Sequence, residues 1–168
     1  KRQYLPGVHV HEKGVFIFQF YHLHPLWMSV FGKLFGDANS SYSLLLFSLL
    51  SIFTMSALVF LISGSRLCAY LSAFLFSVHP LHSFFTKWPV TEIVALFFLF
   101  NGLLFLAFSI KGNSRNENTY YLIISALSFL CLFFTRITGF KYLPFFLIIT
   151  LIGVLYNNKY KILNINVY

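Results

Sequence analysis

The fold is decided by one polar segment between two apolar runs, residues 76–98, FSVHPLHSFFTKWPVTEIVALFF. This segment holds His79, His82, Lys87 and Glu92, and Glu92 is one of only four acidic residues in the chain. Polar groups at the mouth of a helical bundle mark either a turn at the level of the lipid headgroups or a functional site. Both interpretations require that the flanking apolar runs be membrane helices.

The composition supports that requirement. Of the 168 residues, 58% are hydrophobic, 21% are aromatic and only 10% are charged, and the mean hydropathy is +0.78. A soluble domain carries about 25% charged residues, so the chain is predicted to be an all-α, polytopic transmembrane helical bundle. The net charge is +8, but the basic residues lie at the ends of apolar runs, where they meet lipid headgroups. We therefore expect no nucleic-acid partner.

The hydropathy pattern predicts about five spans in a single transmembrane domain covering residues 1–168. A transmembrane helix needs about 20 mostly apolar residues, and the candidates are residues 41–63, 67–85, 90–110, 119–135 and 140–156. The helix at 67–85 should end near Val78, because the residue before a proline avoids the helical region. Asn39 or Ser40 is expected to cap the first span.

The segment before the first span, residues 1–40, is predicted to be a non-cytoplasmic loop followed by interfacial helices. Residues 15–35 are apolar but interrupted by polar residues, so we expect them to lie along the membrane with a break at Pro25. A tilted, kinked span is the alternative interpretation of this stretch.

The orientation follows from the basic residues of the short loops and the tail. With five spans, one side receives Arg66, Lys111, Arg115, Lys159 and Lys161, and the other receives Lys87, Arg136 and Lys141. The positive-inside rule then places the first side in the cytoplasm. The polar segment 76–98 is expected on the non-cytoplasmic face, in the bacterial inner membrane or the endoplasmic reticulum.

Two histidine pairs, His22 with His24 and His79 with His82, raise the question of a metal or haem site. No cysteine lies nearby, and residues two apart do not share a helix face. Haem would need histidines at matching depth inside the bundle, whereas these lie at the ends of spans. We therefore expect no metal and no cofactor.

The remaining charges leave two interpretations open. Lys87, Arg136 and Lys141 could extend to bulk lipid phosphates, or they could form a pocket for one particular lipid phosphate or pyrophosphate. Glu92 begins a span, where the positive end of the helix dipole stabilises its negative charge. An acid that faces the interior of the bundle could also hold an acceptor or a sugar hydroxyl.

Three collinear blocks resemble a known family. They are residues 71–82, LSAFLFSVHPLH, continuing through Trp88 to residues 91–98, TEIVALFF; residues 20–27, FYHLHPLW, followed by Phe35 and Gly36; and residues 127–139, which end in FTRITG. Together these blocks resemble the GT-C glycosyltransferases over roughly residues 15–156. The similarity is greatest to the protein O-mannosyltransferase-like branch that carries tetratricopeptide repeats.

The resemblance implies transfer of a sugar from a polyprenyl-phosphate donor to an acceptor on the non-cytoplasmic face. Arg136 would contact the donor phosphate, and the acid at position 92 would lie on the acceptor side. On the donor side the resemblance implies His22, His24 and Arg136, and we add Lys141 as a basic residue at the same membrane face. On the acceptor side it implies His79, His82 and Glu92, and we add Lys87 for the same reason.

The chain also departs from the family's pattern. The family's first span and the acidic loop after it, which holds the catalytic aspartate, have no counterpart in this sequence, so no catalytic residue is assigned. We therefore expect part of a glycosyltransferase that binds membrane lipids. The alternative is a non-catalytic membrane scaffold subunit of a larger complex, with structural lipid and other membrane subunits as partners.

Overall fold

The computed structural model describes residues 8–10, 16–18, 23–88, 90–112 and 115–136. This part of the chain is helical, apart from a short antiparallel hairpin of β1 (Val8–Val10) and β2 (Phe16–Phe18), in which Val8 is opposite Phe18. The predicted all-α, membrane-type helical bundle is confirmed. The fifth predicted span, residues 140–156, lies outside the described residues.

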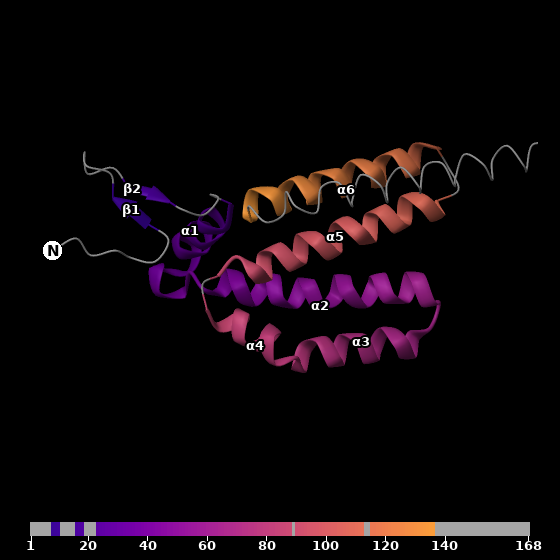
Figure 1. Cartoon of the computed structure of the whole chain (residues 1–168), viewed down its shortest axis with the longest axis horizontal. Helices are drawn as coiled ribbons and strands as arrows, with labels where there is room; N and C mark the ends of the chain where they lie inside the picture. The colour runs from indigo at the N-terminus through magenta and orange to yellow at the C-terminus, as the bar shows by residue number, and fades with distance from the viewer. Residues whose placement is uncertain (1–7, 11–15, 19–22, 89, 113–114, 137–168) are drawn as a thin grey trace, which may run out of the picture.

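Six α-helices and one short 3-10 helix build the described part. They are α1 (Leu23–Phe35), the 3-10 helix η1 (Asp37–Asn39), α2 (Tyr42–Ser63), α3 (Arg66–Val78), α4 (Pro80–Lys87), α5 (Glu92–Lys111) and α6 (Arg115–Thr135). Figure 1 shows the long helices as a row, with α6 beside α5, α5 beside α2, and α2 beside α3. Helix α1 packs against α2 and α6 at one end of this row, which is called the α1 end below.

Three of these helices are long and apolar enough to cross a membrane: α2 with η1, α5, and α6. The bent pair of α3 and α4 makes a fourth candidate if it is taken as one span. Helix α3 alone has 13 residues, which gives about 20 Å, whereas the hydrocarbon core is about 30 Å thick. This architecture is compatible with an integral membrane protein.

The predicted break at His79–Pro80 is confirmed. Helix α3 ends at Val78, His79 has extended backbone angles (φ −62°, ψ 127°), and Pro80 is the first residue of α4. Proline is well suited to that position because its missing N–H would have no partner in the first turn. The two helix axes differ in direction by 55°.

The N-terminal region differs from the prediction. Phe16–Phe18 form a strand, and α1 continues through Pro25 without a break, so the break predicted at Pro25 is wrong. Pro25 is the third residue of α1, within the first turn, where a helix does not need the backbone N–H. Asn39 does not cap α2; its side-chain amide donates to the Phe35 carbonyl (2.9 Å) at the end of α1, and Ser41 precedes α2.

Two clusters of buried side chains hold the α1 end together. The first consists of Leu44, Phe47, Ile93 and Val94, with Trp27 and Phe85 packed against it, and it joins α1, α2, α4 and α5. The second consists of Ala95, Phe129 and Leu132 and joins α5 to α6. Both clusters include residues in the first turn of α5 or directly after it, so the start of α5 is fixed on two sides.

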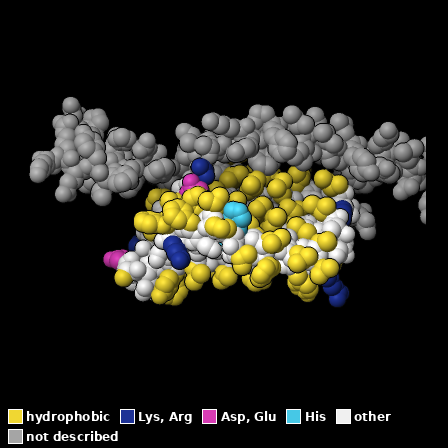
Figure 2. Space-filling model, turned by 60° about the horizontal axis from the view of Figure 1, so that its bottom comes forward, with side chains coloured by type: hydrophobic (Ala, Val, Ile, Leu, Met, Phe, Trp, Pro, Cys, Tyr) yellow, Lys and Arg dark blue, Asp and Glu magenta, His cyan; other side chains and the backbone are white. Residues whose placement is uncertain are grey.

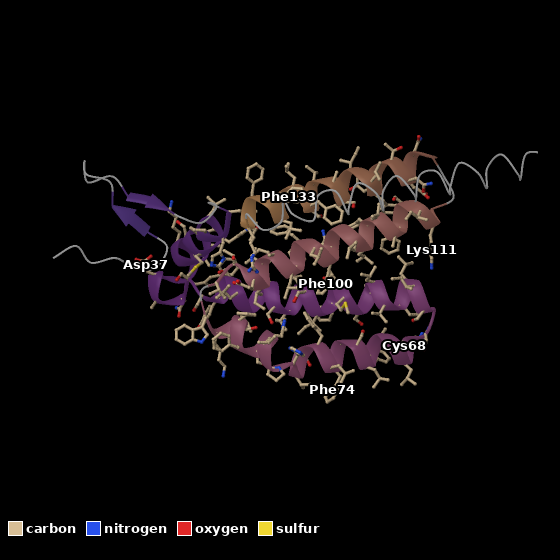
Figure 3. The ribbon with its side chains drawn as sticks, viewed as in Figure 1. Asp37, Cys68, Phe74, Phe100, Lys111 and Phe133 are labelled. Carbon is tan, nitrogen blue, oxygen red and sulfur yellow. The ribbon has the colours of Figure 1, made fainter. Side chains whose placement is uncertain are left out.

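The surface shows the same organisation. In Figure 2, hydrophobic side chains cover the middle of the visible face, and most of the charged side chains lie toward its two ends. Asp37 and Lys111 lie at opposite ends of the bundle (Figure 3). A hydrophobic middle between charged ends is the pattern expected of helices whose ends meet lipid headgroups.

Candidate functional site

An ion pair closes the α1 end of the α5–α6 pair. Arg136 Nη1 lies 3.2 Å from Glu92 Oε1, with 42% of the arginine side chain and 24% of the glutamate side chain exposed. Glu92 is the first residue of α5, and Arg136 directly follows α6, with its backbone N–H donating to the Leu132 carbonyl (3.0 Å). The sequence analysis assigns Arg136 to the donor side and Glu92 to the acceptor side of one site. In the structure these two side chains are in direct contact.

The packing of α5 against α6 explains why these two side chains meet. Helix α6 approaches closely at Gly102, where a Cβ atom would lie 2.7 Å from the Phe129 ring. Two hydrogen bonds join the helices there: Asn101 Nδ2 donates to Ser128 Oγ (2.8 Å) and Ser125 Oγ donates to the Gly102 carbonyl (2.8 Å). Small residues and hydroxyls at such contacts are typical of membrane helix pairs. The close approach sets the register that brings position 92 to position 136.

Arg136 has N–H donors that the ion pair with Glu92 does not use. Guanidinium has five N–H donors in a rigid fork, and the contact with Glu92 uses one nitrogen. The other donors of Arg136 have no hydrogen-bond partner within the described ranges, and the side chain is substantially exposed. Glu92 also benefits from the positive end of the α5 dipole. The carboxylate can thus orient the guanidinium while the N–H groups that it does not engage are able to donate to phosphate oxygens.

His82 belongs to a second polar cluster, buried between α4 and α2. Its side chain is only 4% exposed, and its Nε2 atom lies 2.8 Å from Ser48 Oγ in a shared hydrogen bond. Thr86 Oγ1 contacts both Ser48 Oγ (3.3 Å) and the His82 carbonyl (2.8 Å). The other ring nitrogen, Nδ1, is buried and has no hydrogen-bond partner among the described residues.

This histidine lies deeper than the ion pair. Ser48 is the seventh residue of α2, about 9 Å along the helix from its first residue at 1.5 Å per residue. Helix α4 packs against α2, α3 and α5, whereas Arg136 follows α6 on the other side of α5 (Figure 1). The structure therefore divides the predicted site into an exposed ion pair and a buried histidine cluster.

The other predicted residues are distributed around these two clusters. His79 is exposed at the bend between α3 and α4, and Lys87 is exposed at the last residue of α4. His24 is buried in the first turn of α1, and Trp27, one turn later, packs edge-on against Phe47 with ring centroids 5.3 Å apart. His22 and Lys141 lie outside the described residues.

Sequence reasoning missed Ser48 and Thr86, which hold His82. Ser48 lies inside a clean apolar span, where a single hydroxyl that bonds to its own backbone is unremarkable. A signal was present, since Thr86 follows His82 by four residues and so shares its helix face. The described residues contain no group of three or more side chains able to hold a metal ion.

Comparisons of this chain with protein-family models, with curated proteins and with solved structures find no match.

Proposed function

We propose that this chain is part of an integral-membrane glycosyltransferase of the GT-C type, and that Arg136, positioned by Glu92, binds the phosphate of a polyprenyl-phosphate sugar donor. The observation that carries the proposal is the 3.2 Å contact between Arg136 and Glu92. It joins two of the three blocks of sequence on which the resemblance to that family rests.

The chemistry of the proposed reaction requires a fixed cation. When a sugar leaves a polyprenyl phosphate, negative charge develops on the phosphate oxygens, and a preorganised donor stabilises that charge. Arg136 fits this role because Glu92 orients it and 42% of its side chain is exposed. Glu92 is thereby a positioning residue for Arg136, since its Oε1 atom is engaged by the guanidinium.

A non-catalytic scaffold subunit is the second candidate, and one observation favours it. Among the described residues of the α1 end, the carboxylates are those of Asp37 and Glu92, and Glu92 is engaged by Arg136. A general base for the acceptor hydroxyl would have to come from Asp37 or from outside the described ranges.

The test is mass spectrometry of the lipids that stay bound to the purified native protein. We expect a polyprenyl phosphate on the wild-type protein and at least a tenfold loss in Arg136→Gln, because a charge-assisted hydrogen bond contributes about one order of magnitude or more in affinity. Arg66→Gln is the matched control, since Arg66 is exposed at the opposite end of the bundle, and it should retain the polyprenyl phosphate. If the wild-type protein carries only bulk phospholipid, unchanged in Arg136→Gln, the proposal is wrong and the scaffold remains.

A further inference from the structure

A groove lies between α2 and α3, toward the end opposite α1. Its volume is about 380 Å³, within the range of about 300–1,000 Å³ that is usual for ligand pockets. Phe53, Ala57 and Phe60 line it from α2, and Arg66, Ala69 and Tyr70 line it from α3. It is separate from the Glu92–Arg136 pair, which lies at the α1 end.

The groove exists because small residues face each other across the two helices. Ala57 and Ala69 leave space, and Ser56 Oγ donates to the Ala69 carbonyl (3.0 Å), which holds the helices together behind that space. Phe53, Ala57 and Phe60 are spaced four and three residues apart, so they share one face of α2. Phe53 and Tyr70 are 69% and 70% exposed, so the two aromatic side chains form open walls on either side.

One charged side chain lines the groove. Arg66 is exposed and is the first residue of α3, directly after the turn at Gly64 and Ser65. No acidic side chain of the described residues forms an ion pair with it. A cation in the first turn opposes the helix dipole, so the stability of α3 does not explain an arginine at this place.

The position of Arg66 matches the height of lipid headgroups. Helix α2 has 22 residues, about 33 Å at 1.5 Å per residue, so it spans the hydrocarbon core of about 30 Å and ends near the membrane surface. From Phe60 to Phe53 the groove then runs about 10 Å toward the membrane centre. A charged group at the surface and an apolar channel below it match a phospholipid in its normal orientation.

We infer that this groove binds one anionic glycerophospholipid. The phosphate contacts the Arg66 guanidinium, and one acyl chain lies along Ala57 between the walls made by Phe53, Phe60 and Tyr70. The positive-inside rule favours the cytoplasmic leaflet for the end that carries Arg66 and Lys111, and that leaflet carries the anionic lipids.

The test is native mass spectrometry of the whole chain in detergent, titrated with phosphatidylglycerol or phosphatidylcholine. We expect phosphatidylglycerol to bind about tenfold more tightly than phosphatidylcholine, and Arg66→Gln to remove that preference. Ala57→Phe should weaken the binding of phosphatidylglycerol by a similar factor, because the added ring fills the channel.

Two variants serve as controls. Lys33→Gln removes an exposed charge at the α1 end, and Ala126→Phe adds a ring at an exposed position of α6; both should bind phosphatidylglycerol like the wild-type protein. Equal affinity for both lipids, or equal losses in Lys33→Gln and Arg66→Gln, would overturn the inference. Full competition by glycerol 3-phosphate, which has no acyl chain, would also overturn it. Loss of the polyprenyl phosphate in Arg136→Gln is a separate result, so the two proposals can fail independently.

Discussion

The pair α5–α6 and the pair α3–α4 are both built from apolar helices, yet they differ in how they are held. Helices α5 and α6 meet at Gly102 and share two side-chain hydrogen bonds. Helices α3 and α4 are bent by 55°, and much of their surface is exposed, including Phe74 on the outer side of α3 (Figure 3).

The pair α5–α6 therefore gives rigid support, and the pair α3–α4 provides a more adaptable surface. The close packing of α5 and α6 fixes the positions of Glu92 and Arg136, as a preorganised charge site requires. The bend between α3 and α4 directs His82 to Ser48. The small residues between α2 and α3 leave the groove beside Arg66. Substitutions in the first pair should therefore change the ion pair, and those in the second pair should leave it intact.

The largest effect is expected from Gly102→Leu. The new side chain would overlap the Phe129 ring, because even a Cβ atom would lie 2.7 Å from it. Overpacking of this kind costs about 3 kcal/mol, and it should also separate Arg136 from Glu92. The free energy of unfolding in mixed detergent and SDS micelles measures the cost. Ala126→Leu, at an exposed position of the same helix pair, is the control, and an equal loss of stability there would contradict the close contact.

His82→Ala should have the next largest effect on the free energy of unfolding. Comparing it with His79→Ala contrasts a buried and an exposed histidine of one short segment. Removing the buried ring leaves Ser48 Oγ without its 2.8 Å partner and should lower the free energy of unfolding by about 2 kcal/mol. His79→Ala should change it by less than about 0.5 kcal/mol, because His79 is exposed. If the two variants lose equal stability, the assignment of His82 to the core of the bend is wrong.

A smaller effect is expected from the hydrogen bond between Asn101 and Ser128. A double-mutant cycle with Asn101→Ala and Ser128→Ala isolates the energy of this 2.8 Å contact. Coupling energies of such bonds in membrane proteins average about 0.6 kcal/mol, and we expect that value here. A coupling energy of zero would show that this hydrogen bond contributes nothing to holding the two helices together.

The sequence predicted the helical class and the end of α3 at Val78. Both follow from local rules, since hydropathy and proline act over a few residues. The alternation of spans placed Arg136 and Glu92 at the same membrane face, but the sequence did not predict that their side chains are in direct contact. The prediction of a break at Pro25 was wrong because a proline disrupts the interior of a helix but not its first turn. The sequence did not locate the start of α1, so it did not show that Pro25 falls in the first turn.

The burial of His82 could not be predicted either. Its depth depends on the direction of α4 after the bend and on a hydroxyl 34 residues earlier in the chain. No periodicity within residues 76–98 encodes that long-range contact. The groove beside Arg66 was missed for the same reason, because it requires small residues on two helices to face each other.

The central claim is that Arg136 binds a lipid phosphate and that Glu92 only positions it. The most direct measurement is the equilibrium affinity of the purified chain for undecaprenyl phosphate in nanodiscs, compared among the wild type, Arg136→Gln and Glu92→Gln. We predict at least a tenfold loss in Arg136→Gln, because the cation is removed. Glu92→Gln should lose no more than about threefold, because the arginine keeps its charge while a repulsive carboxylate is neutralised. Equal losses in both variants, or no loss in either, would contradict the claim and leave the ion pair as a structural contact between α5 and α6.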